Sequence, residues 1–166
     1  MDGVCVTGGE PLLRPDLGAL LADIKALGYP VKLDTNGAFP QKLKQLVSGG
    51  LVDYVAMDIK NSPARYGETV GVPGLDPAPF RESAEYLLSG AVDYEFRTTV
   101  VAEFHDAASF AAIGDWIAGA KRYFLQSFVD RETVIRPGLH PRSEAELRDY
   151  LALLRPKIPA AELRGL

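Results

Sequence analysis

Glycines and polar side chains follow the apolar segments of this chain, where they are placed to hold a small charged molecule. The first group is Thr7-Gly8-Gly9-Glu10, at the end of an apolar run that begins at Val4. Two adjacent glycines let the backbone adopt positive φ and let a ligand lie against main-chain N–H and C=O groups. Pro11 stops the strand and fixes φ for the turn that follows. The pattern predicts a backbone cradle for a polar ligand.

Four later apolar segments end in the same way. A charged residue inside an apolar strand is costly to bury unless it is paired or liganded. Because parallel strands point their C-terminal ends to one face of a sheet, the groups together predict one convergent polar site. These groups are Asp34-Thr35-Asn36, Asp58 with Lys60, Arg97-Thr98-Thr99, and Gln126-Ser127.

Each group also has a plainer interpretation when it is taken alone. The glycine pair is then only a tight turn, and the segment from Asp34 to Gly37 is an ordinary Asx turn. Asp58 and Lys60 then form a surface ion pair, and Arg97 has a structural role.

The hydrophobic pattern alternates between strand and helix along the chain, which predicts a parallel sheet covered by helices. About five such units are too few to close an eight-stranded barrel. We therefore expect an α/β fold, an open partial TIM-like barrel of about five strands with helices outside, in a single domain over residues 1–166. The expected strands are Val4–Thr7 (buried), Val31–Thr35, Tyr54–Ile59, Tyr94–Val101 and Arg122–Phe128. The expected helices lie at 15–27, 40–48, 80–89, 107–118 and onward from Ser143.

Composition narrows the class of protein and its partners. The chain is 47% hydrophobic and has a net charge of −4, which gives no reason to expect nucleic acid or an anionic membrane as a partner. No apolar run approaches ~18 residues, and no signal peptide is recognisable. The single cysteine, Cys5, excludes an internal disulfide. We expect a cytoplasmic protein, with Cys5 in the core, His105 as an exposed neighbour of a helix start, and no role for His140.

Three segments in chain order carry a family resemblance. They are Thr-Gly-Gly-Glu-Pro-Leu at 7–12, Leu-Asp-Thr-Asn-Gly at 33–37 and Val-Ala-Met-Asp-Ile-Lys at 55–60. Together they resemble the activating enzymes of glycyl radical proteins, within the radical S-adenosylmethionine (radical SAM) family. The resemblance covers essentially the whole chain and is strongest up to Gly71. It implies an open barrel of six βα units, of which the first, with its Cys-x3-Cys-x2-Cys motif, is expected to be missing from this N-terminally truncated sequence.

The resemblance also implies roles for single residues. Gly8, Gly9 and Glu10 match the segment that holds the methionyl amino group of S-adenosylmethionine (SAM), and Lys60 matches the cation that pairs with its carboxylate. Asp34 and Thr35 match positions near the ribose and a monovalent cation, and Asp58 matches a further ligand of that cation. Arg97 matches an arginine that faces the bound SAM. None of these residues is implied to be catalytic.

The implied chemistry needs a [4Fe–4S] cluster on three thiolates, which cleaves SAM to a 5′-deoxyadenosyl radical. That radical would take hydrogen from a glycine of a partner enzyme, such as anaerobic ribonucleotide reductase or pyruvate formate-lyase. Flavodoxin or ferredoxin would donate the electron. With one cysteine, the chain alone is expected to hold no cluster and to be inactive. Two alternatives stay open: a radical SAM enzyme for a small molecule, similar to 7-carboxy-7-deazaguanine synthase, and a binding module without a cluster.

Overall fold

The computed structural model describes residues 2–130 and 137–165, and these fall into two compact units. Unit 1 comprises Met1–Asp58 and Ala78–Glu95, and unit 2 comprises Ile59–Pro77 and Phe96–Leu166. In neither described part is there a helix with the length and apolar composition needed to cross a membrane.

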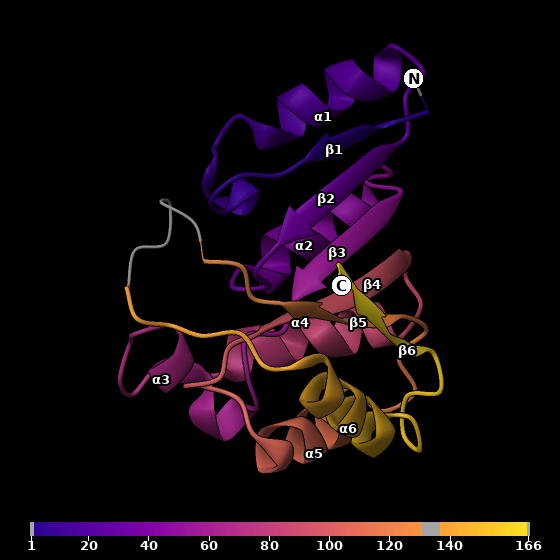
Figure 1. Ribbon diagram of the computed structural model, residues 1–166. Helices are drawn as coiled ribbons and strands as arrows, with labels where there is room; N and C mark the ends of the chain where they lie inside the picture. Colours follow the sequence, from indigo (N-terminus) through magenta and orange to yellow (C-terminus); the bar gives the residue numbers. More distant parts are fainter. Residues whose placement is uncertain (1, 131–136, 166) are drawn as a thin grey trace. The chain divides into compact units, whose positions relative to one another are not determined.

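Strands and helices alternate along the chain, as the hydrophobic pattern predicts (Figure 1). The strands are β1 Val4–Val6, β2 Val31–Thr35, β3 Tyr54–Asp58, β4 Asp93–Val100, β5 Tyr123–Ser127 and β6 Ala161–Arg164. The helices are η1 Pro11–Leu13, α1 Leu17–Ala26, α2 Pro40–Ser48, η2 Pro63–Arg65, α3 Tyr66–Thr69, α4 Ala78–Leu88, α5 Ala107–Trp116 and α6 Glu144–Leu154.

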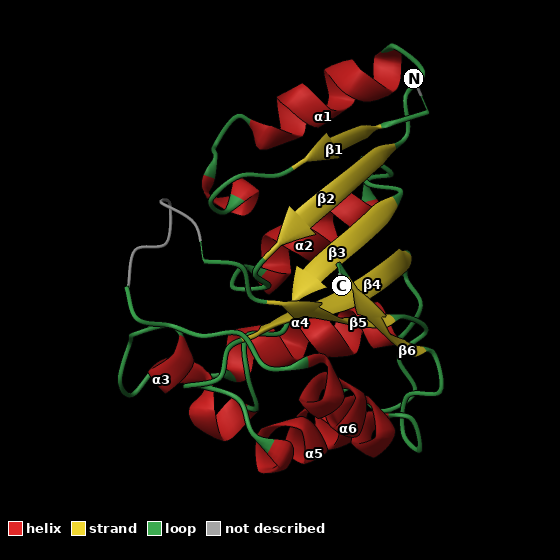
Figure 2. Cartoon of the chain, viewed as in Figure 1, coloured by secondary structure: helices red, strands yellow, loops and turns green. Residues whose placement is uncertain are grey.

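The strands form an open parallel sheet in the order β1-β2-β3-β4-β5-β6 (Figure 2). This confirms the predicted α/β class with an open sheet. The sheet has one strand more than the five that were expected, because β6 follows the last helix. Its four residues, Ala-Glu-Leu-Arg, are too few and too weakly apolar to be recognised as a strand from the sequence.

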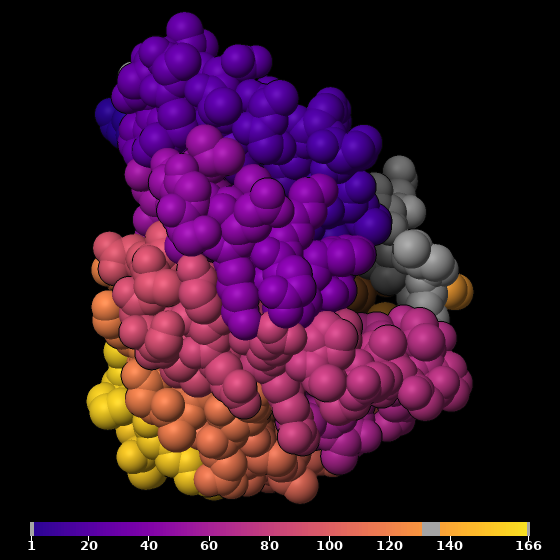
Figure 3. Space-filling view, turned by 180° about the vertical axis from the view of Figure 1, so that it is seen from behind, coloured from indigo at the N-terminus to yellow at the C-terminus, as the bar shows by residue number. Residues whose placement is uncertain are grey.

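In unit 1, the side chains of β2 alternate between two environments. Val31, Leu33 and Thr35 are buried, whereas Lys32 and Asp34 are half-buried on the opposite face. This is the period of two that a strand imposes. Helices α2 and α4 lie side by side, and Gln41 and Lys44 of α2 bond to Glu82 of α4. Residues of α1 and α2 form part of the surface seen from behind (Figure 3). The face that carries Lys32 and Asp34 is therefore the polar face of this part of the sheet.

The first strand is less buried than its apolar composition predicts. β1 lies at the edge of the sheet and pairs with β2, and its three residues are half-buried or exposed. Cys5, expected in the core, is exposed and donates a long hydrogen bond to Asp34 Oδ1 at 3.7 Å. An edge strand has a neighbouring strand on one side only. Its side chains are therefore more exposed than its apolar composition predicts.

In unit 2, helices α5 and α6 pack together through stacked rings. The centroids of Phe110 and Tyr150 are 4.6 Å apart. Helix α6 begins with the predicted capping box, in which Ser143 and Glu146 exchange side-chain and backbone hydrogen bonds. The segment 129–141 was expected to be irregular; residues 131–136 of it lie outside the described part of the chain.

Candidate functional site

The turn after β1 exposes two glycines to open space. Gly8 has a φ of 140°, which favours glycine, whereas Gly9 does not have a positive φ. A Cβ atom built on either residue would meet no protein atom within 4 Å. Packing within the protein therefore gives no reason for glycine at position 9. The free space beside this backbone is what a closely bound ligand would require.

The side chain of Glu10 fixes this turn to the turn that follows β2. Its Oε1 accepts hydrogen bonds from Leu12 N and Thr35 Oγ1, both at 3.0 Å, and its Oε2 accepts one from Asn36 N at 2.6 Å. These three bonds occupy the carboxylate with protein donors. Glu10 therefore holds the glycine turn in its conformation. Both oxygens of its carboxylate accept hydrogen bonds from the protein itself.

The turn after β2 is closed by its own hydrogen bonds. Asn36 Oδ1 accepts from Ala38 N at 2.8 Å, which confirms the Asx turn, and Thr35 Oγ1 accepts from Gly37 N at 3.1 Å. Gly37 has a φ of 82°, and a Cβ there would collide with Met57 Cε. The positive φ, together with the shift that a Cβ would force on the Met57 side chain, thus explains the glycine at position 37.

A charged network lies beside Asp34 on the polar face of unit 1. Lys32 Nζ is 3.5 Å from both Asp34 Oδ1 and Glu95 Oε1, and Tyr54 donates its hydroxyl to Glu95 Oε2 at 3.2 Å. Glu95 is 4% exposed. Sequence reasoning missed Lys32 and Glu95. For Lys32 the signal was its alternation with Asp34 between buried neighbours, which places both on one face of β2. For Glu95 it was a charged residue between buried neighbours in β4.

Asp58 ends β3, one residue beyond the register pair Thr35–Met57. Six predicted site residues thus lie at the C-terminal ends of neighbouring strands in unit 1: Gly8, Gly9, Glu10, Asp34, Thr35 and Asp58. Lys60 and Arg97 belong to unit 2, where Ile59 N donates to Arg97 O at 2.8 Å and brings the two segments together.

The cation predicted at Asp34, Thr35 and Asp58 has few available ligands. The hydroxyl of Thr35 already donates to Glu10 and accepts from Gly37. Among the described residues, no three His, Cys, Asp or Glu side chains gather as a metal site would require.

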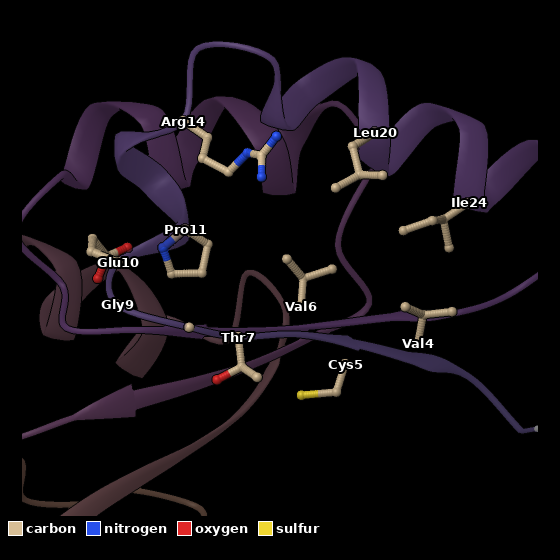
Figure 4. A pocket seen from close by; sticks show the side chains of 11 residues that line it. Val4, Cys5, Val6, Thr7, Gly9, Glu10, Pro11, Arg14, Leu20 and Ile24 are labelled. Carbon is tan, nitrogen blue, oxygen red and sulfur yellow. The ribbon is translucent and has the colours of Figure 1, made fainter. Parts of the chain in front are cut away.

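Beside the glycine turn, an open groove of about 550 Å³ lies between β1 and α1. Val4 and Val6 face it from the strand, and Leu20 and Ile24 face it from the helix (Figure 4). Cys5 and the hydroxyl of Thr7 point to the opposite side of β1 (Figure 4). The strand thus has an apolar face toward α1 and a polar face toward Asp34.

The two histidines occupy different environments. His105 was expected to be exposed, but it is 2% exposed, and both ring nitrogens have backbone partners. Its Nε2 lies 2.9 Å from the carbonyl oxygen of Lys60, 45 residues away in the chain. His140 is exposed and bonds to Glu103, whose pKa falls to about 2 because it accepts hydrogen bonds from the His140 backbone and ring.

A sequence profile of the radical SAM superfamily matches residues 1–105. The chain belongs to the radical SAM superfamily. It is 30% identical over 143 residues to a Methanocaldococcus jannaschii protein that carries the name of a glycyl-radical enzyme activating enzyme; the match covers 79% of this chain and 56% of that protein. It is 31% identical over 107 residues to the benzylsuccinate synthase activating enzyme of Thauera aromatica, covering 63% of this chain and 31% of that protein.

Other radical SAM proteins are also similar. The 7-carboxy-7-deazaguanine synthase of Thermococcus kodakarensis is 36% identical over 66 residues, or 39% of this chain and 25% of that protein. The chain spans about half the length of the Methanocaldococcus relative, and less of the others. In fold, it is similar to a crystallised domain of pyruvate-formate lyase-activating enzyme from Bacteroides vulgatus, with a TM-score of 0.80, 17% identity, and coverage of 99% of this chain and 100% of that one. These findings confirm the predicted family.

Proposed function

We propose that this chain is the SAM-binding part of an enzyme that activates a glycyl radical enzyme. The observation that carries the proposal is the open backbone at Gly9. The space there is free of protein atoms, and the residue has no positive φ that would demand glycine. Exposed backbone groups without side-chain cover suit the methionyl amino group, which needs carbonyl acceptors at close range.

The other predicted residues then have distinct tasks. Gly8 and Gly9 bind the methionyl amino group through their backbone, and Lys60 pairs with the methionyl carboxylate. Asp34 contributes a carboxylate to the ribose or to a bound cation, and Arg97 faces the SAM. Glu10 acts through its hydrogen bonds to Thr35 and Asn36, which hold the glycine turn in shape.

The residues of this chain do not fit a [4Fe–4S] cluster. Such clusters are held by several cysteine thiolates, and the chain has one cysteine, on β1. The chain therefore lacks the thiolates that a cluster would need. Anaerobic reconstitution of the purified chain, followed by iron and sulfide analysis, should find no stoichiometric cluster, and a SAM-responsive cluster in the monomer would contradict this.

The proposed protein substrate is a glycyl radical enzyme, with flavodoxin or ferredoxin as the electron donor. Support comes from two relatives that carry names of activating enzymes. A second candidate is the synthesis of a small molecule, favoured by the match to 7-carboxy-7-deazaguanine synthase.

Calorimetric titration of the SAM-saturated chain separates the two candidates. We expect heat of binding from a peptide that carries the radical glycine segment of a glycyl radical enzyme. Binding of the small heterocyclic substrate of 7-carboxy-7-deazaguanine synthase, without binding of the peptide, would overturn the first proposal in favour of the second. Binding of neither would favour a module that binds SAM alone.

A further inference from the structure

Buried polar side chains hold the segment Ile59–Ser62, which follows β3 in unit 2. Thr98, on β4, is 1% exposed and donates its hydroxyl to Ile59 O at 2.6 Å. The same hydroxyl is 2.7 Å from the hydroxyl of Tyr123, which is buried in the core. Since Thr98 gives its one hydrogen to Ile59, Tyr123 donates to Thr98. The Ile59 carbonyl is therefore fixed by a chain of two buried hydroxyls.

His105 fixes the next carbonyl of the segment. Val101 N donates to His105 Nδ1 at 3.0 Å, closer than the 3.2 Å that separates Nδ1 from Val101 O, so we assign Nδ1 as the acceptor without a proton. The proton must then lie on Nε2, which donates to Lys60 O at 2.9 Å. The ring also stacks on Phe110, with centroids 5.7 Å apart. Burial lowers the pKa of His105, which keeps the ring in this neutral form.

Asn61 completes the arrangement. Its Nδ2 donates to Phe104 O at 2.9 Å and to Thr69 Oγ1 at 2.8 Å, and its Oδ1 accepts from Ser62 N at 2.7 Å. The residue is fully buried. All of its side-chain hydrogen-bonding atoms thus serve to hold this segment in place.

The bonds from Thr98 and His105 act on the two peptide groups that flank the Cα of Lys60. Fixing the carbonyl before it and the carbonyl after it restricts both backbone dihedrals of Lys60. Lys60 itself is half-buried, whereas Asn61, Ser62, Thr98 and His105 are buried. Polar groups are costly to bury, and here four of them gather around a single lysine.

We propose that His105 and Thr98 are positioning residues for Lys60, which they hold in the backbone conformation that presents its ammonium group to the methionyl carboxylate of SAM. The inference rests on the proposed function, in which Lys60 makes that contact. Neither residue touches the ligand. Their effect on SAM binding passes through Lys60 and disappears when Lys60 is removed.

Matched substitutions distinguish a role in positioning Lys60 from a general contribution to the stability of the fold. His105→Asn and His105→Gln both remove the ring from Phe110. Asn keeps an oxygen near the Nδ1 position but is too short to reach Lys60 O, whereas Gln extends an amide N–H toward the Nε2 position. Thr98→Val removes the hydroxyl and keeps the shape, and Thr98→Ser keeps the hydroxyl. His140→Gln is the control for the loss of an exposed histidine of unit 2.

The measurements are SAM affinity of the 166-residue chain by anaerobic calorimetry, its melting temperature, and the NMR shift of the Asn61 amide, which shares a peptide group with Lys60 O. We expect His105→Asn and Thr98→Val to weaken SAM binding about 5- to 10-fold, less than the loss of more than tenfold that removing a charge-assisted hydrogen bond causes. His105→Gln and Thr98→Ser should bind nearly as the native chain does, and His140→Gln should bind unchanged. The Asn61 amide should shift in His105→Asn and return toward its native position in His105→Gln.

A double-mutant cycle with Lys60→Ala decides the question. In the Lys60→Ala background, His105→Asn and Thr98→Val should cost no further affinity. If Lys60→Ala itself leaves SAM affinity unchanged, or the native chain binds no SAM, the proposed function fails. A different result is that Lys60→Ala weakens SAM binding while His105→Asn and Thr98→Val have no effect, or while their effects add to that of Lys60→Ala. In either case the positioning proposal fails and the proposed function stands. Should His105→Asn not fold, the Thr98 pair carries the same comparison.

Discussion

The glycine turn at Gly8-Gly9 and the segment Ile59–Ser62 are built in opposite ways. The glycine turn is exposed, and no protein atom lies where a side chain of either glycine would begin. The other segment is held by buried partners on each side of Lys60. The first surface is open, as the proposed binding of SAM requires, whereas the second is ordered in advance by the protein. A contact ordered in advance costs less conformational entropy on binding, so the two regions should respond differently to mutation.

The largest effect is expected from Gly9→Val, which should abolish SAM binding and leave the melting temperature unchanged. A branched side chain would occupy the space beside the backbone, and its Cβ atom would meet no protein atom within 4 Å. Calorimetry and thermal unfolding measure the two effects. Gly18→Ala in α1 is a suitable control, because its Cβ would make only an ordinary contact, 3.8 Å from Leu46 Cδ2. A lower melting temperature for Gly9→Val would place the glycine among structural residues.

Lys60→Ala should come next, with a loss of roughly 1.5–3 kcal/mol in SAM binding, the usual range for a hydrogen bond to a charged group. The measurement is again the dissociation constant for SAM. Lys44→Ala provides the comparison, since Lys44 pairs with Glu82 on the surface of unit 1, and exposed pairs contribute little. Equal affinities for the two lysine variants would remove Lys60 from the site.

Gly37→Ala should act on stability and not on ligand binding. A Cβ there would collide with Met57 Cε and would be forced into a positive φ. The expected cost is about 1–3 kcal/mol in the free energy of unfolding, measured by urea denaturation. The folded variant should bind SAM as the native chain does. This is the reverse of the result expected for Gly9→Val. If the two variants changed stability and SAM affinity in the same way, the distinction between the open turn and the packed turn would fail.

The smallest effect concerns pH. Burial lowers the pKa of His105 below its ordinary value, against its hydrogen bonds to the Lys60 and Val101 backbone, which raise it. Arg65 lowers this pKa further, and Asp106 raises it. The unfolded chain therefore takes up the proton first, and the contribution of His105 is complete above a pH of about 6.5 and is lost as the pH falls below it. Urea unfolding at several pH values should show a smaller loss of stability on acidification for His105→Gln than for the native chain. Parallel curves would show that His105 is not linked to folding.

Much of the fold could be predicted because its signals are local. The positions of the helices, the capping box at Ser143 and the Asn36-Gly37 turn depend on neighbours in the sequence, and the structure shows them where they were expected. The apolar stripe of α1 is only partly buried, since Leu20 and Leu27 are exposed. The exposure of Cys5 was not predictable in this way, since burial of a strand depends on a neighbouring strand. The burial of His105 depends on Lys60, which is 45 residues away.

The candidate site shows the same limit. The strand ends carried a recognisable order of glycines and charges, so their common location in each unit followed from parallel strands. The three hydrogen bonds that the Glu10 carboxylate accepts could not be predicted from the sequence. They depend on the exact distance between two turns that are far apart in the chain. Sequence patterns indicate which side chains gather, but not which of them remain available to a ligand.

The most direct test of the central claim is the titration of SAM into the isotopically labelled chain, followed by NMR. We predict that the backbone amides of Gly8 and Gly9 shift with SAM concentration, together with those around Lys60, while the amide of the packed Gly37 moves less. The Gly9→Val chain should show none of these changes. Shifts that leave Gly8 and Gly9 in place, or that persist in Gly9→Val, would contradict the claim that this open turn binds SAM.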